Sequence, residues 1–181
     1  MKASAKNVQS ESDMKGKPIP ADGFHHVTII HVNDSRVKKD GSVFPYTVVE
    51  FEVLAGSVPG QEDKTVSQFY ALGQNGEETA EYCEKVSRLC LAAGILKPGE
   101  EKDVDLSDLE NAQVVIKSQS YEKKDKTIGC GLADYGLGVW GVGHPEVASV
   151  PKNSEAIRLW REENGPPAGG NGQSGNGSDE I

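Results

Sequence analysis

One stretch of this chain alternates between apolar and polar side chains with a period of two, and this pattern predicts a strand that buries one face. The stretch is SVFPYTVVEFEVL, residues 42–54, and its expected core face carries Thr47, Val49, Phe51 and Val53. The opposite face carries Tyr46, Val48, Glu50 and Glu52. Because side chains of a strand point alternately to the two faces of a sheet, a half-buried antiparallel sheet is expected. Pro45 predicts a bend or an edge near the strand start, since proline cannot donate to the ladder.

Four other stretches predict strands, because they are apolar or β-branched and are bounded by turn residues. They are FHHVTIIHV (24–32), TVSQFYAL (65–72), AQVVIKSQSY (112–121) and a glycine-rich segment around LGVWGV (137–142). A helix is expected between the third and fourth strands, with Asn75 as N-cap, Glu78 at N3 and Gly94 just beyond its end. Its apolar stripe consists of Tyr82, Cys83, Val86, Leu89, Cys90 and Ala93. A short amphipathic helix is expected after a cap at Asn153 or Ser154.

The order of these elements is strand, strand, strand, helix, strand, strand. This is the order of a five-stranded OB-fold barrel, with its helix between strands 3 and 4. Another small five-stranded antiparallel sheet gives much the same pattern, and that alternative stays open. We expect a disordered arm over residues 1–21, the OB-fold domain with its C-terminal helical extension over 22–163, and a disordered Gly-rich tail with an acidic tip over 164–181.

Composition and motifs exclude several classes of protein. The 181 residues include three cysteines without CxxC spacing and no apolar run long enough to span a membrane. Residues 1–23 lack the apolar centre of a signal peptide, which predicts a cytoplasmic protein, in the bacterial host if the source is viral. P-loop, GxSxG and HExxH motifs are absent from the sequence, and we predict no enzymatic activity, cofactor or metal. The adjacent His25 and His26 are expected on opposite faces of a strand, where they cannot share a metal.

The basic residues gather in two polar stretches, although the formal net charge is −9. The stretch NDSRVKKDGS carries Arg36, Lys38 and Lys39, and the stretch IKSQSYEKKDKT carries Lys117, Lys123, Lys124 and Lys126. These stretches are expected to join strands 1 and 2 and strands 4 and 5, the loops that hold oligonucleotides in OB-folds. We predict that the seven side chains contact phosphates. The alternative is that they are solvated residues of hairpin turns.

Aromatic residues near these stretches are candidates for stacking on bases. The candidates are Phe44, Tyr46, Tyr70 and Tyr121. Phe69 and Tyr70 are neighbours in one expected strand, and we predict that Tyr70 points outward because of its hydroxyl. Exposed aromatics on strands are more often cross-strand packing partners, and this alternative applies to each candidate.

Three segments and the tail together resemble phage-type single-stranded DNA-binding proteins. The segments are GSVFPYTVVEFEVLAG (41–56), AEYCEKVSRLCLAAGIL (80–96) and DLSDLENAQVVIKSQSYEKKDKT (105–127), within a similarity that covers residues 22–143. The resemblance implies binding of single-stranded DNA with little sequence preference in replication or recombination. It also implies recruitment of replication or recombination proteins by the tip Asp179, Glu180 and Ile181. This tip has two acidic side chains, where the bacterial family has a longer acidic run ending in an aromatic.

A second interpretation belongs to another class. The same fold could serve as a protein-interaction or structural module of a phage or replication assembly that binds no nucleic acid. The sequence distinguishes neither DNA from RNA nor a monomer from a homo-oligomer.

Overall fold

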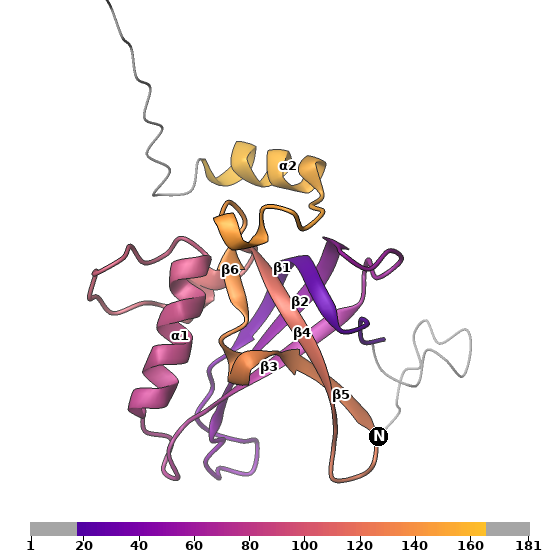
Figure 1. Cartoon of the computed structure of the whole chain (residues 1–181). Helices are drawn as coiled ribbons and strands as arrows, with labels where there is room; N and C mark the ends of the chain where they lie inside the picture. The colour runs from indigo at the N-terminus through magenta and orange to yellow at the C-terminus, as the bar shows by residue number, and fades with distance from the viewer. Residues whose placement is uncertain (1–17, 166–181) are drawn as a thin grey trace, which may run out of the picture.

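The computed structural model describes residues 18–165, which form one antiparallel sheet with two α-helices packed beside it (Figure 1). The strands are β1 (Gly23–Asn33), β2 (Tyr46–Gly56), β3 (Thr65–Ala71), β4 (Gln113–Glu122), β5 (Ile128–Leu132) and β6 (Val139–Gly141). The helices are α1 (Ala80–Ala92) and α2 (Ser154–Asn164), with short 3-10 turns η2 (Leu106–Leu109), η3 (Asp134–Gly136) and η4 (Pro145–Val147). No helix within this range is long and apolar enough to cross a membrane.

The strands lie in the order β3-β2-β1-β4-β5, and β6 pairs with β4 beside this path. The sheet is not closed by a backbone ladder between its end strands β3 and β5. A side chain connects them instead, because the Leu132 N–H donates to Gln68 Oε1 at 2.8 Å. Two register shifts in the β1–β2 ladder, at His26/Val27 and at Ile29/His31, accompany the curvature of the sheet.

The core lies between this sheet and α1. The predicted inward face of β2 is confirmed, since Thr47, Val49, Phe51 and Val53 are all buried. From α1, Tyr82, Leu89 and Cys90 pack against them. Burial of each large apolar side chain stabilises the fold by about 1.5–3 kcal/mol. The buried Thr47 hydroxyl is satisfied by the hydroxyl of Tyr82 at 2.9 Å.

Helix α1 begins later than the sequence predicts. Its N-cap is Thr79, whose Oγ1 accepts the Tyr82 N–H at 3.2 Å, and the predicted cap Asn75 lies in the preceding turn. The reason is Gly76, whose φ of +80° places a left-handed residue where the earlier helix would have run. The predicted end at Gly94 is confirmed by its φ of +78°. Cys83, expected on the apolar stripe, is exposed.

The fifth strand was expected around residues 137–142, and this prediction is wrong. The strand that follows β4 is β5, which forms a tight hairpin with it from Ser118↔Leu132 to Glu122↔Ile128. The predicted segment forms β6, which pairs with β4 at Val114–Ile116. Lys117 and Tyr121 therefore lie within β4 and not in a loop. The left-handed Lys126, with φ of +67°, lets the chain reverse within the short tip of this hairpin.

Both ends of the domain differ slightly from the predicted boundaries. Residues 18–21, expected in the disordered arm, are held by the Thr65 N–H, which donates to the Pro18 carbonyl at 3.1 Å, and by the Ala21 N–H, which donates to Gln61 Oε1 at 2.8 Å. Helix α2 begins after an N-cap at Asn153, one of the two predicted positions. The rest of the arm and of the tail, including Asp179, Glu180 and Ile181, lies outside the described residues.

Candidate nucleic-acid interface

Three aromatic rings form a row on the outer face of β2 and β3. Phe44 precedes β2, Tyr46 is its first residue, and Phe69 lies on β3. The ring centroids of Phe44 and Tyr46 are 5.8 Å apart, and those of Tyr46 and Phe69 are 5.9 Å apart. Both contacts are edge-to-face, so ring faces remain open to solvent. Tyr46 and Phe69 are 38% and 47% exposed.

The prediction for Phe69 and Tyr70 is wrong, because Phe69 points outward and Tyr70 is buried in the core. The ladder explains this inversion. Tyr70 pairs with Thr47 and Phe69 with Val48, so each side chain follows the face of its partner on β2. Burial raises the pKa of Tyr70, whose hydroxyl has no hydrogen-bond partner among the described residues. Tyr70 is too deeply buried to contact a ligand, and Phe69 replaces it as a candidate for stacking.

Tyr121 lies across the β4–β5 hairpin on a surface made of glycine. It pairs with Gly129 in the ladder, and a Cβ on Gly129 would lie 2.7 Å from Cζ of the Tyr121 ring. Glycine at this position therefore lets the Tyr121 ring lie flat on the hairpin, and any larger residue would displace the ring. Gly131 continues the same surface, since its Cβ would lie 3.7 Å from Cε1 of Tyr121. The arrangement leaves Tyr121 44% exposed.

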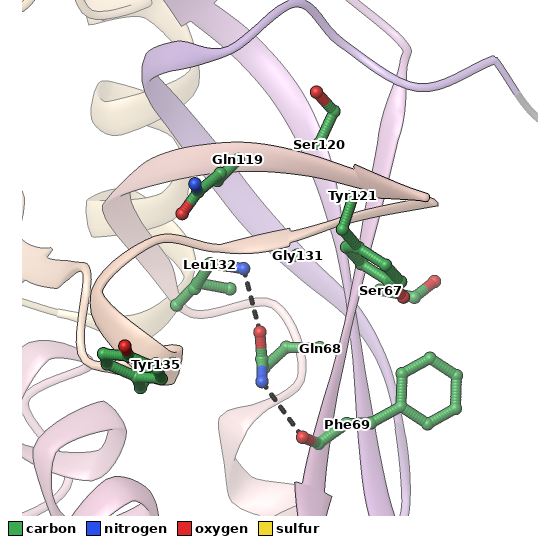
Figure 2. A pocket seen from close by; sticks show the side chains of 10 residues that line it. Ser67, Gln68, Phe69, Gln119, Ser120, Tyr121, Gly131, Leu132 and Tyr135 are labelled. Carbon is green, nitrogen blue, oxygen red and sulfur yellow. Dashed lines mark hydrogen bonds between the residues drawn. The ribbon is translucent and has the colours of Figure 1, made fainter. Parts of the chain in front are cut away.

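A groove of about 410 Å³ lies between β3 and the β4–β5 hairpin (Figure 2). We call it the β3–β5 groove; it is lined by Ser67, Gln68, Phe69, Gln119, Ser120, Tyr121, Gly131, Leu132, Tyr135 and Gly136. None of these lining residues is charged. Phe69 belongs both to the groove and to the aromatic row, so the two form a continuous aromatic surface.

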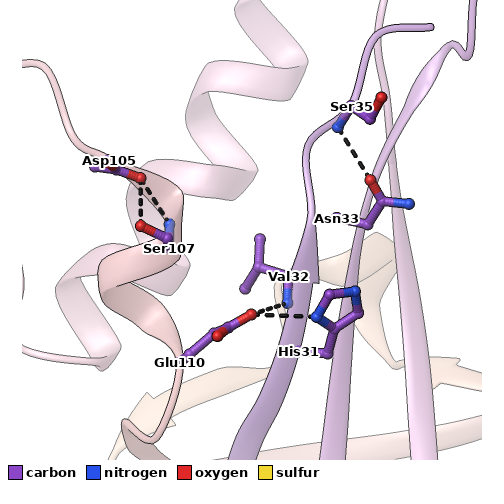
Figure 3. A network of polar contacts seen from close by, with 7 residues as sticks. All are labelled: His31, Val32, Asn33, Ser35, Asp105, Ser107 and Glu110. Atoms are coloured by element: carbon purple, nitrogen blue, oxygen red, sulfur yellow. Dashed lines mark hydrogen bonds and ion pairs between the residues drawn. The ribbon is translucent and has the colours of Figure 1, made fainter.

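The first basic loop, residues 34–45, carries two lysines at its tip. The Lys38 N–H donates to the Ser42 carbonyl at 2.8 Å, and the left-handed Gly41 completes the turn, as the Asp40-Gly41 pair predicts. The strand that leads into the loop is fixed by Glu110, whose Oε1 accepts the Val32 N–H at 2.9 Å (Figure 3). Lys38 and Lys39 are exposed.

Arg36 differs from these lysines because protein groups occupy its guanidinium. One nitrogen lies 3.3 Å from Glu78 Oε1 and another donates to Thr47 Oγ1 at 3.3 Å. The guanidinium carbon also stands 5.6 Å from the centroid of the Tyr82 ring. Arg36 therefore ties the first basic loop to the start of α1, and a phosphate at Arg36 would compete with these protein groups.

The second basic loop is the tip of the β4–β5 hairpin, residues 123–127. The Lys123 N–H donates to the Thr127 carbonyl at 2.8 Å and Asp125 accepts from Thr127, so the tip is well ordered. Lys123 and Lys124 are exposed, whereas Lys126 is paired with Glu122 at 2.7 Å. Exposed pairs of this kind contribute about 0–1 kcal/mol, so Lys126 exchanges partners readily. In Figure 1 both basic loops project toward the same end of the sheet.

Lys117 lies away from this surface. Its ammonium stands 5.9 Å from the centroid of the Phe24 ring, and Phe24 packs on Trp140 with centroids 5.7 Å apart. The Trp140 Nε1–H donates to Glu146 Oε2 at 2.7 Å. Phe24 and Trp140 pack on a second apolar cluster beneath η4, so the Lys117 ammonium lies beside this cluster, and the prediction that Lys117 lies in the second loop is wrong.

The outer face of the sheet changes from aromatic to acidic side chains along β2. Glu50 and Glu52 follow Tyr46 on the same face, about 13 Å and 20 Å along the strand at 3.3 Å per residue. They face Ser67 and Thr65 on β3. The outer face of β2 is therefore negatively charged on the side of the aromatic row that is farther from the basic loops. A polyanion would be confined to the end of the sheet that carries the two basic loops.

Sequence reasoning identified Phe44, Tyr46, Tyr121 and the two loops; the structure links Phe44 and Tyr46 to Tyr121 through Phe69 and directs both loops toward the same end of the sheet (Figure 1). It missed Phe69, Gln68, Gln119 and Tyr135 of the groove. Regular alternation from Val66 through Gln68 to Tyr70 could have indicated which aromatic points outward, but two adjacent aromatics made the pattern ambiguous. Nothing in the sequence signals Tyr135 beyond the following glycine.

Within residues 18–165, no group of three or more His, Cys, Asp or Glu side chains has the arrangement of a metal site. His25 and His26 do point to opposite sides, one toward the Ala21 carbonyl and the other toward Gln113. No protein-family model and no curated protein sequence matches this chain.

Proposed function

We propose that this protein binds single-stranded DNA with little sequence preference, in replication or recombination. The observation that carries the proposal is the aromatic row Phe44–Tyr46–Phe69, which continues into the β3–β5 groove beside Tyr121 and lies at the end of the sheet with the two basic loops. Single-strand binders combine stacking surfaces with positive charge that follows the backbone. This end of the sheet offers both.

The strand order supports an OB-fold, with β6 as an addition. In that fold a five-stranded sheet curls until its third and fifth strands meet, and the loops after strands 1 and 4 flank the ligand. Here the Gln68 side chain links β3 to β5, and the basic loops are those that join β1 to β2 and β4 to β5. The resemblance to phage-type single-stranded DNA-binding proteins leads to the same proposal.

Stacking and charge have separate roles in the proposed complex. Each stacked base contributes about 1–3 kcal/mol, and stacking tolerates any base because every base has a π-face. Lysines contribute through release of counterions from the phosphates, which makes affinity depend on salt. Among the described ion pairs, none engages Lys38, Lys39, Lys123 or Lys124, so these ammonium groups can meet phosphates without breaking another contact.

Titration of a fluorescently labelled oligo-dT with the full chain, repeated over a range of salt concentrations, tests the proposal. We expect binding at low salt and a linear fall of log affinity with log salt. A duplex of the same length should bind more weakly, because its bases cannot stack on the aromatic row. Absence of oligo-dT binding at low salt would contradict the proposal and favour the protein-interaction module.

The tip Asp179, Glu180 and Ile181 completes the proposal as a site that recruits replication or recombination proteins. Its test is a pull-down with the full chain and with the chain shortened by these three residues. Loss of a partner on shortening, with unchanged DNA affinity, is the expected result.

A further inference from the structure

Tyr135 is the most exposed large side chain of the described residues that line the groove, at 90% exposure. Its backbone is left-handed, with φ of 56° and ψ of 34°. Asp134 before it and Gly136 after it are also left-handed, with φ of 55° and 88°. A bulky non-glycine residue in this region is strained, and such strain persists only where the surrounding structure imposes it.

Strand β4 imposes this conformation. The Ala133 N–H donates to the Lys117 carbonyl at 2.8 Å, and the Lys117 N–H donates to the Gly138 carbonyl at 2.9 Å. The Ala133 carbonyl in turn accepts the N–H groups of Gly136 and Gly138 at 3.2 and 3.1 Å. The turn 133–138 is therefore closed on itself and fixed to one residue of the sheet. It holds the Tyr135 ring out in solvent, where the ring contributes little to the core.

The exposed Tyr135 ring lies at one end of the β3–β5 groove. Figure 2 shows Tyr135 on one side of Gln68, with Tyr121 and Phe69 on the other side. Aromatic rings thus stand at both ends of the β3–β5 groove, and the amides of Gln68 and Gln119 and the hydroxyl of Ser67 lie among them (Figure 2). A lining without charge does not favour a phosphate. It suits a planar, neutral group with hydrogen-bonding edges.

The two amides of the groove differ in their freedom to bind such a group. Gln68 Oε1 accepts the Leu132 N–H, and its Nε2 donates to the Phe69 carbonyl at 3.0 Å. Gln119 is exposed, and no hydrogen bond of the described residues involves its side chain. Its amide carries a donor and an acceptor side by side, which matches the edge of a nucleobase.

We propose that the β3–β5 groove is a subsite for one unpaired nucleobase of the bound strand, with Tyr135 as a stacking residue and Gln119 as the group that meets the base edge. This inference rests on the proposed single-stranded DNA binding and deepens it. The lysines of the second basic loop flank the groove through Lys123, whose Cε lies against the same glycine surface as Tyr121. The phosphates of the bound strand remain outside the β3–β5 groove, and one base inserts into the groove.

The test compares Tyr135→Gly with Tyr135→Phe in the full chain, by oligo-dT affinity and by thermal unfolding. Glycine adopts the left-handed conformation without strain but increases the conformational entropy of the unfolded chain, and the exposed ring packs on little, so Tyr135→Gly should melt close to the wild-type temperature. The same variant should bind oligo-dT about five- to a hundred-fold more weakly, because one stacking contact is lost. Tyr135→Phe keeps the ring and should bind like the wild type.

A single 2-aminopurine in the oligonucleotide reports on the base directly. Its fluorescence should be quenched on binding to the wild type at one position of the strand, and Tyr135→Gly should abolish that quenching. If the wild type binds oligo-dT and Tyr135→Gly binds equally well with equal quenching, the subsite is overturned and the proposed function stands. If the wild type binds no oligo-dT at low salt, both are overturned.

Discussion

Two clusters in this protein contain the same kinds of side chain, aromatic rings beside cations, but only one of them is satisfied internally. In the cluster beneath η4, the ring of Trp140 packs on Phe24, and its Nε1–H donates to Glu146. Arg88 stands 5.8 Å from the centroid of the Trp140 ring and donates through Nε to the Leu137 carbonyl at 2.7 Å. At the loop end of the sheet, Tyr46, Phe69 and Tyr121 remain more than a third exposed.

The difference shows that the types of residue do not decide the role of such a cluster. What decides it is whether each ring face and each charge already has a partner. The cluster around Trp140 has its partners within the chain, and this assigns it to stability. The row Phe44–Tyr46–Phe69 has edge contacts only, and no described ion pair engages the nearby Lys38, Lys39, Lys123 and Lys124. These open ring faces and lysines are the features on which the proposed binding of single-stranded DNA rests.

The largest expected effect follows from removing charge at the open cluster. Changing Lys38, Lys39, Lys123 and Lys124 together to Gln should weaken oligo-dT binding by roughly two to three orders of magnitude at 0.1 M salt and reduce the salt slope by about 3, at about 0.7 per phosphate contact. Anisotropy titrations over a salt series measure both. The unfolding free energy should stay nearly constant, because all four side chains are exposed.

A matched control for this variant is available on the connection after α1. Lys97 and Lys102 are exposed and lie outside both basic loops. Their replacement by Gln should leave the salt slope unchanged apart from a small effect of net charge. If the slope per charge removed is the same in both variants, binding is diffuse and the loops are not the site.

The next largest effect should appear in the closed cluster. Trp140→Ala should lower the unfolding free energy by about 3 kcal/mol, because it removes a packed ring and leaves a cavity. Urea unfolding followed by circular dichroism measures the change. At a temperature where the variant is folded, its oligo-dT affinity should equal that of the wild type. A specific loss of affinity in folded Trp140→Ala would erase the distinction between the two clusters.

The opposite result is expected for Phe69→Ala, which should lower oligo-dT affinity by about 1–3 kcal/mol at low and at high salt. Its unfolding free energy should change by less than about 1 kcal/mol, since the ring is half exposed. The matched variant is Tyr70→Phe, which removes a buried hydroxyl that has no described partner. Tyr70→Phe should leave affinity unchanged and stability equal or slightly higher. Reversed behaviour of the two variants would mean that the outward ring is Tyr70.

The contrast between Phe69 and Tyr70 also shows which parts of the fold could be predicted from the sequence. The alternation in β2 specified its core face, because Glu50 and Glu52 leave one face only for burial. The end of α1 was predictable from Gly94, since the signal is local. On β3 two aromatics compete, and which of them is buried depends on the register with Thr47 and Val48. The register of β3 against β2 depends on how the two strands pair, and neither strand's sequence specifies that pairing by itself.

The candidate site was predictable to a similar degree. Loops and their lysines follow from turn residues and composition, so the positions of Lys38, Lys39, Lys123 and Lys124 in exposed loops were predictable. The contact of Arg36 with Glu78 was not predictable, because Glu78 lies 42 positions away in the sequence. Tyr135 was missed because its exposure depends on the turn that β4 holds in place. Each error concerns a contact between distant segments, which composition and periodicity do not report.

The smallest expected effect concerns the closed side of the molecule and its dependence on pH. His26 is fully buried beneath the start of α2. Its Nδ1 accepts the Asn153 N–H at 3.1 Å, and its Nε2 lies 2.9 Å from Gln113 Oε1, which accepts the single N–H proton of the neutral ring. The Gln113 Nε2–H continues the chain to the Ala156 carbonyl at 3.0 Å. A neutral imidazole therefore links β1 to β4 and to the first turn of α2.

Burial lowers the pKa of His26, and nearby Lys152 lowers it further, although the bond to Gln113 opposes them. The unfolded chain takes up this proton below about pH 6.5 and the folded chain does so only at lower pH, so stability falls as pH decreases through this range. The pKa of His25 is lowered by burial as well, so it adds to the same trend. Each histidine contributes at most about 1.4 kcal/mol at pH 5.5 relative to pH 7.5. Urea unfolding at the two pH values should show this loss, and His26→Gln should reduce it. A loss of stability that is equal in the wild type and in His26→Gln would contradict the neutral buried ring that the Asn153 N–H contact requires.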